Sequence, residues 1–319
     1  MLKTKSEIIT PFYQTELGQA YLGDSLELMK LIPDNSVNLV LTSPPFALTR
    51  QKEYGNKLEQ EYIDWFMQFS AEFYRIMQPN GSVAIDLGGA YLPGHPIRSI
   101  YQYELLVRLC REQKFFLAQE FFHYNPARLP TPAEWVTVRR IRVKDSVNIV
   151  WWLSKTENPK ANNKQVLKPY SDSMKSLLKN GYKAQLRPSG HDISEKFSID
   201  NGGAIPPNLL ELANTESNSY YMKRCKELGL KPHPARFPKD FADFFIKFAT
   251  NEGDLVFDPF AGSNTTGYSA ELLNRKWLSF EISEPYLECS KIRFEEEPNL
   301  FNQESKLNGK GKSQKVRIA

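Results

Sequence analysis

The chain has 319 residues, of which 41% are apolar, and its formal net charge is +4. This length fits one large α/β domain with an insertion, or two domains. The composition suits a soluble globular protein, and it excludes a membrane-spanning protein because no apolar run approaches the roughly eighteen residues of a span. Three widely spaced cysteines, Cys110, Cys225 and Cys289, and an N-terminus without a signal-peptide core favour a reduced, cytoplasmic protein.

The first half of the chain alternates predicted strands and helices. Apolar runs and turn residues predict strands at 19–24, 37–41, 82–87, 114–123 and 146–153. Helical spacing of apolar residues predicts helices at 25–31, 59–77 and 101–112. The Pro-Asn-Gly sequence at 79–81 is expected to end the second of these helices.

The sequence becomes polar and loses its regular apolar pattern at Ser154, and that pattern returns at His233. The polar stretch between them, rich in Asn, Ser and Lys, predicts an inserted module built mostly of loops and short helices. After it we expect a helix at 239–250, a strand at 254–258, a loop and helix at 259–274, a strand at 276–281 and a helix at 284–296.

A sharp turn follows the predicted buried strand at 37–41, and its residues are Thr42, Ser43, Pro44, Pro45 and Phe46. Two consecutive prolines end the strand, because each fixes φ and neither has an N–H group. The turn therefore presents a hydroxyl, a carbonyl and an aromatic ring at a sheet edge of the kind that binds ligands. Such groups suit methylation of an exocyclic amine of a base. Acceptors on Ser43 and Pro44 would hold the amine hydrogens and free the nitrogen lone pair, while Phe46 would stack on the ring.

A second motif at 254–281 has the order strand, glycine loop, helix, strand and acidic residue. This is the layout of a nucleotide-type cofactor site. Gly262 lets a ligand approach the backbone closely, and Glu281 could accept hydrogen bonds from both hydroxyls of a ribose. The loop lacks the lysine of a phosphate-binding loop and the three glycines of a dinucleotide fingerprint.

Residues 258–266, Asp-Pro-Phe-Ala-Gly-Ser-Asn-Thr-Thr, resemble the S-adenosylmethionine loop of DNA amino-methyltransferases. Asn264 stands where that family usually has Gly, and Asn tolerates a left-handed φ. The turn at 42–46 resembles the family's catalytic turn, in which Ser43 points to cytosine-N4 rather than adenine-N6 members. The turn precedes the loop, which is the family's β arrangement, and similarity to the PvuII-type cytosine-N4 enzymes of restriction–modification systems covers residues 18 to about 296 in pieces.

The resemblance implies an S-adenosylmethionine-dependent methyltransferase fold of the α/β class. It would be a Rossmann-like mixed sheet flanked by helices, in circularly permuted order, with an inserted target-recognition module. The implied divisions are a catalytic half at 1–153, the target-recognition module at 154–232, a cofactor-binding half at 233–298 and a flexible tail at 299–319. The implied reaction is methyl transfer to N4 of a cytosine flipped out of double-stranded DNA.

The resemblance implies the catalytic and cofactor-binding residues, and the clustering of basic residues adds the expected DNA contacts. The catalytic group is Ser43, Pro44, Pro45 and Phe46. The implied cofactor contacts are Asp24, Pro234, Ala235, Arg236, Phe237, Asp258, Phe260, Ala261, Gly262, Ser263, Asn264, Thr265 and Glu281. The expected phosphate-binding residues are Arg50, Lys52, Arg128, Arg139, Arg140 and Arg142. The four histidines show no metal-ligand spacing, so no metal is predicted.

Four alternatives to this function are weighed against the same residues. An adenine-N6 DNA methyltransferase stays open, and so does a DNA-binding protein on an inactive methyltransferase fold. A cytosine-C5 enzyme needs a cysteine nucleophile, typically after proline, and here Leu109, Arg224 and Glu288 precede the cysteines. A protein-glutamine methyltransferase has its cofactor loop before an Asn-containing turn, and both features fail. The expected partners are DNA and a functionally linked restriction endonuclease, and the chain is expected to be a monomer or a homodimer without membrane attachment.

Overall fold

A single mixed β-sheet forms the centre of the protein. The structure is a computed structural model that describes residues 2, 9–46, 59–181, 199–214 and 219–295. Nine strands lie in the order β1-β2-β9-β8-β3-β4-β6-β5-β7. Their bounds are Tyr13–Gln14 (β1), Gly18–Leu22 (β2), Val37–Thr42 (β3), Met77–Leu87 (β4), Phe116–Tyr124 (β5), Val147–Ser154 (β6), Leu209–Glu211 (β7), Leu255–Asp258 (β8) and Lys276–Glu281 (β9).

Parallel strands make up the middle of the sheet, and antiparallel pairs flank them. Neighbouring strands from β2 to β4 along that order are parallel, so their carboxyl ends meet at one edge. β6 runs antiparallel to both β4 and β5, and β1 runs antiparallel to β2. This confirms the predicted mixed α/β sheet and brings the ends of β3 and β8 next to each other.

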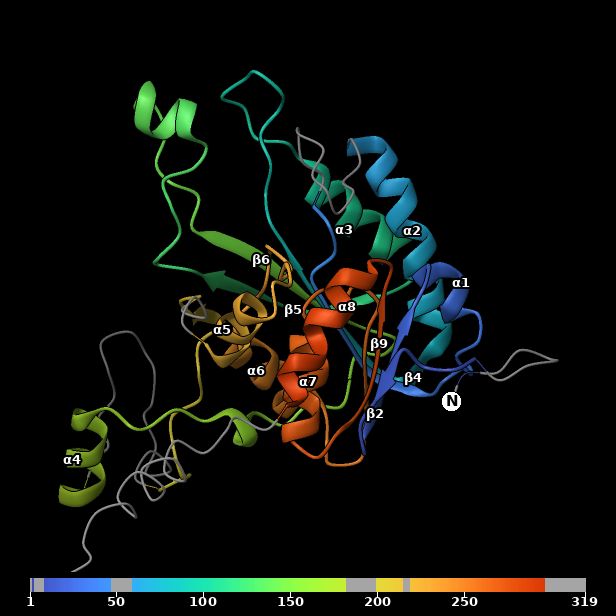
Figure 1. Ribbon diagram of the computed structural model, residues 1–319. Helices are drawn as coiled ribbons and strands as arrows, with labels where there is room; N and C mark the ends of the chain where they lie inside the picture. The colour runs from blue at the N-terminus through green and yellow to red at the C-terminus, as the bar shows by residue number, and fades with distance from the viewer. Residues whose placement is uncertain (1, 3–8, 47–58, 182–198, 215–218, 296–319) are drawn as a thin grey trace, which may run out of the picture.

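Helices cover both faces of the sheet, and Figure 1 shows the two layers. On one face lie α1 (Ser25–Met29), α2 (Glu59–Ile76) and α3 (Tyr101–Arg111). On the other lie α6 (Lys239–Ala249), α7 (Thr265–Leu272) and α8 (Glu284–Lys291). The described residues also form a π-helical turn η1 (Glu134–Val138), the 3₁₀ turns η2 (Asn163–Val166) and η5 (Ile292–Phe294), and the α-helices α4 (Asp172–Asn180) and α5 (Tyr220–Glu227).

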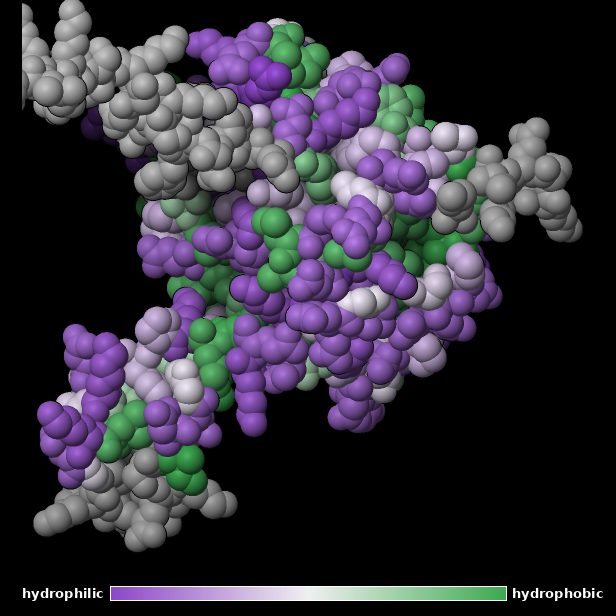
Figure 2. Space-filling model, turned by 60° about the horizontal axis from the view of Figure 1, so that its bottom comes forward, coloured by the Kyte–Doolittle hydropathy of each residue, from purple (hydrophilic) through white to green (hydrophobic). Residues whose placement is uncertain are grey.

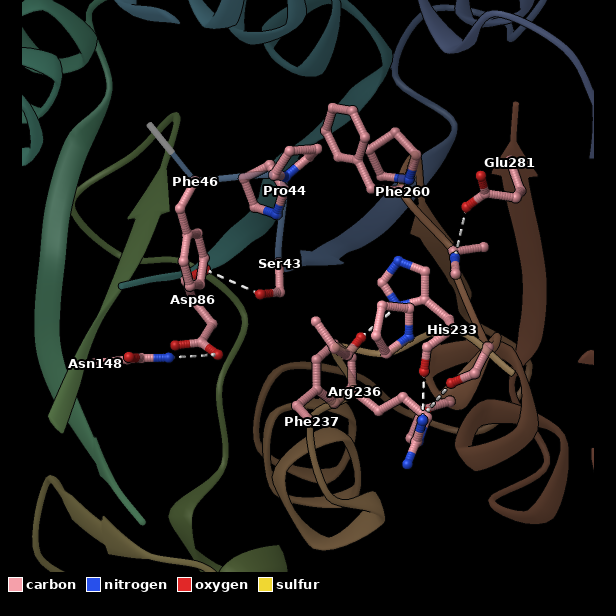
Figure 3. Close-up of a pocket in the computed structure, with 18 of the residues that line it drawn as sticks. Ser43, Pro44, Phe46, Asp86, Asn148, His233, Arg236, Phe237, Phe260 and Glu281 are labelled. Carbon is pink, nitrogen blue, oxygen red and sulfur yellow. Dashed lines mark hydrogen bonds between the residues drawn. The ribbon is translucent and has the colours of Figure 1, made fainter. Parts of the chain in front are cut away.

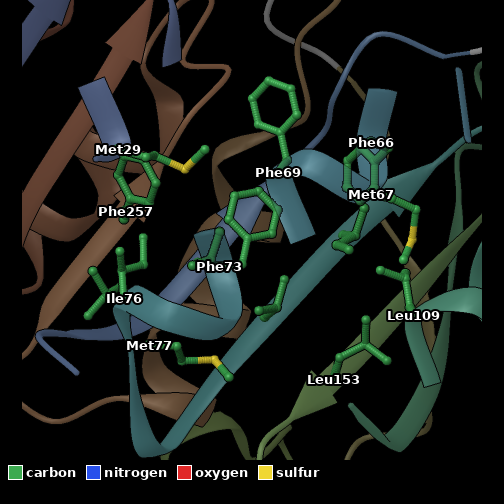
Figure 4. Packing of buried hydrophobic residues seen from close by; sticks show 14 of the residues in the cluster. Met29, Phe66, Met67, Phe69, Phe73, Ile76, Met77, Leu109, Leu153 and Phe257 are labelled. Atoms are coloured by element: carbon green, nitrogen blue, oxygen red, sulfur yellow. The ribbon is translucent and has the colours of Figure 1, made fainter. Parts of the chain in front are cut away.

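Aromatic residues of α2 pack within the core on its face (Figure 4). Phe66, Phe69 and Phe73 pack ring to ring, with centroids 6.1 to 6.3 Å apart. Residues of β3 alternate between the two cores, since Val40 faces α2 whereas Leu39 and Leu41 face α6. Each fully buried side chain of this size stabilises the fold by about 1.5 to 3 kcal/mol.

Three strands differ most from the expectation. β1 lies before the first predicted strand and pairs with β2. β4 begins at Met77 rather than Ser82, because Met77 pairs with Val37 across a bulge and the Pro-Asn-Gly segment is absorbed into the strand. The third difference is β7, at 209–211, which lies in the polar stretch predicted to hold mostly loops and short helices. It pairs in parallel with the end of β5, and its Leu210 is buried in the core against α6.

Long connections leave the compact body at two places. Residues 125–146, between β5 and β6, form what we call the basic arm, and they include η1. α4 lies well away from the sheet at the lower left of Figure 1. Figure 2, turned from that view so that the bottom comes forward, shows a face covered mostly by hydrophilic side chains. None of the described helices has the length and apolarity needed to cross a membrane.

Candidate active site

The two motifs singled out in the sequence meet at the carboxyl ends of β3 and β8. Thr42 Oγ1 donates a hydrogen bond of 2.8 Å to Asp258 Oδ1, although 216 residues separate the two. Thr266 Oγ1 donates to the other carboxylate oxygen at 2.7 Å, and the Phe260 amide donates to Oδ1 at 3.0 Å. Burial raises the pKa of Asp258 to about 6, so these three donors are what stabilises its charged form. The carboxylate fastens the turn and the glycine loop to each other.

A cavity of about 890 Å³ lies between the turn and the loop. Ser43 and Gly262 both line it, which confirms that the two segments share one cavity. Its size is typical of a pocket for a small molecule or cofactor. The predicted residues that line it are Asp24, Ser43, Pro44, Pro45, Phe46, Arg128, Pro234, Ala235, Arg236, Phe237, Phe260, Ala261, Gly262, Ser263, Thr265 and Glu281.

Ser43 is oriented by the neighbouring strand. Its hydroxyl donates to the backbone carbonyl of Asp86 at 3.2 Å (Figure 3). A hydroxyl has one proton and two lone pairs, so a proton committed to Asp86 leaves the Ser43 oxygen as an acceptor toward the cavity. Phe46 packs on Gly88, where an added Cβ would lie 2.7 Å from ring atom Cδ2. The ring therefore depends on a glycine for its place in the wall.

A row of polar side chains crosses three adjacent strands beside the turn. Asn148 of β6 donates to Asp86 Oδ2 of β4 at 3.3 Å, and Arg128 donates to Asn148 Oδ1 at 2.9 Å. His123 of β5 lies with Nδ1 3.5 Å from the same Asp86 oxygen. Within the described part of the chain, Asp86 Oδ1 and both His123 nitrogens are buried without a hydrogen-bond partner. Such groups are costly unless a ligand pairs with them.

The opposite half of the cavity is built from the glycine loop and the end of β9. Gly262 has φ +52°, and an added Cβ would lie 3.2 Å from the His233 ring, so both conformation and space favour glycine. Glu281 accepts the Gly262 amide at 2.8 Å and the Ser283 amide at 2.9 Å. Burial raises the pKa of Glu281, and these amides oppose that effect. Each carboxylate oxygen retains a lone pair for a further donor.

Residues 233–238 lie over the glycine loop, as Figure 3 shows for His233, Arg236 and Phe237. The His233 ring contacts Tyr286 of α8 edge to face at 4.6 Å. Asn214 donates to the Arg236 carbonyl at 2.8 Å, which ties this segment to the residues after β7. From the other side, Arg293 donates to the Ser263 carbonyl at 2.7 Å. The loop is held from several elements at once.

Asn264 adopts the left-handed conformation expected of the residue that replaces the family's glycine, with φ 51° and ψ 43°. It is fully buried, and its side-chain oxygen accepts from Ser279 Oγ at 2.7 Å and from the Gly267 amide at 3.1 Å. Its amide nitrogen donates to the Tyr13 hydroxyl of β1 at 2.8 Å. These bonds brace the loop from behind, and burial raises the pKa of Tyr13 to about 12, so it remains a neutral phenol.

Several predicted site residues lie elsewhere. Asp258 and Asn264 do not line the cavity but hold the loop from behind. Arg139, Arg140 and Arg142 are exposed on the basic arm and do not line the cavity either. Arg50 and Lys52 lie outside the described residues. Across the described ranges, no group of three or more His, Cys, Asp or Glu side chains is placed to hold a metal ion.

The sequence interpretation missed a second set of lining residues. They are Ser25, Glu61, Tyr62, Trp65, Phe69, Asp86, His123, Asn125, Asn148, Asn214, Pro259 and Ile282. One signal was present, because Asp86 is a charged residue inside an otherwise apolar strand. The aromatic residues of α2 belong to the core, but Tyr62, Trp65 and Phe69 also form a wall of the cavity. This wall lies next to Phe260, whose ring centroid is 4.8 Å from that of Phe69.

Comparisons with known proteins agree with this geometry. A family model described as DNA methylase matches residues 37–292. The type II methyltransferase M.PvuII of Proteus hauseri is 53% identical over 287 residues, which cover 89% of this chain and 85% of that protein. A solved structure of PvuII DNA methyltransferase, described as cytosine-N4-specific, matches with a TM-score of 0.75, 44% identity and 94% coverage of both chains. The M1.HpyAVI–SAM complex shares the fold at 19% identity, with a TM-score of 0.52 over 87% of this chain and 99% of that one.

Proposed function

Because this chain belongs to the DNA methylase family, we propose that it transfers a methyl group from S-adenosylmethionine to the N4 amino group of a flipped cytosine in double-stranded DNA. The observation that carries the proposal is the shared cavity of Ser43 and Gly262, fastened by the hydrogen bond between Thr42 and Asp258. The family membership gives the reaction class, and the relatives described as PvuII enzymes favour cytosine-N4 as the target.

Ser43 and Pro44 would act on the amine by accepting its two hydrogens. The lone pair of an exocyclic amine is delocalised into the ring, so the nitrogen is a weak nucleophile until its hydrogens are held out of the ring plane. The Ser43 hydroxyl is preset as an acceptor because its own proton goes to the Asp86 carbonyl. The Pro44 carbonyl, fixed by the two prolines, would supply the second acceptor. Catalysis in this scheme is mainly positioning.

Phe46 would stack on the flipped base. Extrusion of a base costs a few kcal/mol, which stacking and pocket hydrogen bonds must offset. Gly88 gives the Phe46 ring its place, and Tyr101 donates to the Gly88 carbonyl at 2.5 Å, so the start of α3 supports the end of β4 under the ring. Phe46 thus rests on a backbone that is itself held by a buried side chain.

The other half of the cavity fits S-adenosylmethionine. Gly262 removes the Cβ that would obstruct a ligand, Glu281 keeps lone pairs for ribose hydroxyls, and Phe260 and Ile282 offer apolar faces to an adenine ring. Asp24, whose Oδ1 caps α1 through the Leu26 amide at 2.8 Å, lines the same half and could accept from the adenine amino group. When bound, this cofactor supplies an electrophilic methyl group on a sulfonium.

The basic arm would bind the DNA backbone around the flipped nucleotide. Arg139, Arg140 and Arg142 are exposed there, and the Arg139 guanidinium lies 5.2 Å from the centroid of the Trp135 ring. Arginines of this kind contribute phosphate contacts without sequence information. Residues 154–232 would form the target-recognition module. The type II relative favours a functional pairing with a restriction endonuclease, and bacterial DNA as substrate implies action in the cytoplasm.

One assay tests the proposal against its alternatives. Duplex DNA is incubated with the enzyme and tritiated S-adenosylmethionine, and the digested nucleosides are identified by mass spectrometry. N4-methylcytosine supports the proposal, and N6-methyladenine would replace it with the adenine alternative. No transfer by the wild type, with DNA binding retained, would favour the inactive DNA-binding protein. The Ser43→Ala variant is the matched negative control for transfer.

A further inference from the structure

Arg128 differs from the other arginines of the basic arm. Arg139, Arg140 and Arg142 are exposed and do not line the cavity, whereas Arg128 is half-buried and lines it. Its backbone amide donates to the Asn125 carbonyl at 3.2 Å, and its own carbonyl accepts from the Lys144 ammonium at 3.3 Å. The backbone N–H and the carbonyl of Arg128 are therefore both held by hydrogen bonds, so its side chain extends from a fixed backbone.

A chain of hydrogen bonds connects this guanidinium to the proposed catalytic serine. Ser43 Oγ donates to the Asp86 carbonyl, Asn148 donates to the Asp86 carboxylate, and Arg128 Nη1 donates to Asn148 Oδ1. All four side chains line the same cavity, so the chain runs along the wall that faces a base held at Ser43. Because Asn148 Oδ1 is engaged by Arg128, its NH₂ group must point toward Asp86, with one N–H to spare.

The guanidinium has donors left over. One N–H is used on Asn148, and among the described residues no carboxylate forms an ion pair with Arg128. An arginine carries five donors in a planar fork and no acceptor. Within the described residues, the hydrogen-bond chain therefore ends, on the side away from Ser43, in free hydrogen-bond donors. They are the remaining N–H groups of Arg128 and the second N–H of Asn148.

We infer that Arg128, held by Asn148, reads the O2 carbonyl of the flipped cytosine and so selects cytosine over adenine. This inference rests on the proposed cytosine-N4 activity. When its N4 amine lies at Ser43, a cytosine presents two acceptors, N3 and O2, along the rest of its Watson–Crick edge. An adenine placed the same way has one acceptor and a C–H in place of O2. A buried donor left facing a C–H loses its hydrogen bond, which is how polar pockets reject analogues.

The competing role for Arg128 is a phosphate contact like that of the other arginines. A phosphate contact acts equally on every target base, because it carries no sequence information. A contact to O2 affects only bases with that acceptor. The two roles therefore predict different substrate dependence for the same variant.

The experiment compares target bases in one duplex context, after modified-base sequencing of exposed DNA has identified the recognition site. Three duplexes carry cytosine, adenine or 2-thiocytosine at the target position, the last replacing O2 with a weak acceptor. Single-turnover methylation is measured for the wild type, Arg128→Ala, Arg128→Lys and the control Arg139→Ala. Calorimetric binding of S-adenosylmethionine checks that each variant is folded.

We expect the wild type to lose about 10- to 100-fold in rate on 2-thiocytosine, as for a lost hydrogen bond to a charged group. Arg128→Ala should lose a similar factor on cytosine, no further factor on 2-thiocytosine and none on adenine. Arg128→Lys should restore part of the loss because it keeps the charge but not the fork. Arg139→Ala should leave the ratios between bases unchanged.

Equal losses for Arg128→Ala on all bases, including complete loss on all, would overturn the inference and assign Arg128 to phosphate binding or structure. A wild type that methylates 2-thiocytosine as fast as cytosine would also overturn it. A wild type that methylates adenine and not cytosine would instead overturn the proposed function, so the two failures can be told apart.

Discussion

Gly88 offers a direct test of whether the position of Phe46 matters. In Gly88→Ala the new Cβ would lie 2.7 Å from Cδ2 of the Phe46 ring. Carbon atoms pack at about 3.5 to 4 Å, so the ring must retreat by roughly 1 Å. A displacement of that size at a reacting group can cost about 100-fold in rate. Gly88 is on the base side of the cavity, so S-adenosylmethionine binding should be retained, and overpacking should cost about 1 to 3 kcal/mol of folding free energy.

The neighbouring glycine supplies the matched control. In Gly89→Ala the new Cβ would meet the guanidinium of Arg98, which is the end of a flexible, partly exposed side chain that can move aside. Methyl transfer by both variants is measured as kcat/KM for DNA, together with calorimetric cofactor affinity and thermal unfolding. We expect a loss of 10- to 100-fold for Gly88→Ala only. Equal activity of the two variants would refute the idea that the ring of Phe46 must occupy this place.

Four more predictions concern other parts of the site. Ser43→Ala should lower kcat by at least about 100-fold with cofactor affinity intact; near-normal turnover would remove Ser43 from the mechanism. Glu281→Ala should weaken S-adenosylmethionine binding about tenfold or more in calorimetry, and unchanged affinity would contradict the ribose assignment. The pKa of Asp258 is raised to about 6 in the folded protein, so the folded state binds the carboxyl proton more tightly than the unfolded state does. The contribution of Asp258 to the free energy of unfolding is therefore greatest below about pH 4. It falls by up to about 3 kcal/mol as the pH rises to 7. Denaturation of wild type and Asp258→Asn at both pH values measures this, and a difference independent of pH would refute it. DNA affinity should fall steeply with salt, and a flat response would argue against phosphate binding by the basic arm.

Much of the fold follows from the sequence because its periodicity is strong. The strand at 276–281 has the predicted bounds, and α2 ends one residue before the prediction. β4 was placed five residues late because Pro79 and Gly81 read as helix terminators, whereas pairing of Met77 with Val37 draws the segment into the sheet. The three residues of β7 carry no periodic signal, and only their pairing with Phe122–Tyr124 at the end of β5 makes them a strand. The division of the chain into functional segments stays a prediction.

The site is predictable where residues are adjacent in the chain and not where strands bring them together. The turn at 43–46 and the loop at 260–263 are each recognisable from local sequence, and both line the cavity. Asp86, His123 and Asn148 come from three strands whose pairing register alone aligns them, so no single stretch of sequence reveals the row.

Asn264 makes β1 a structural support of the distant glycine loop. A glycine there could adopt the same backbone angles but would have no amide to reach the Tyr13 phenol or the Ser279 hydroxyl. A hydrogen bond thus connects Tyr13, near the start of the chain, to a loop some 250 positions later. Removing β1 from the front of the chain, even without touching the cavity wall, would remove that hydrogen bond and loosen the glycine loop.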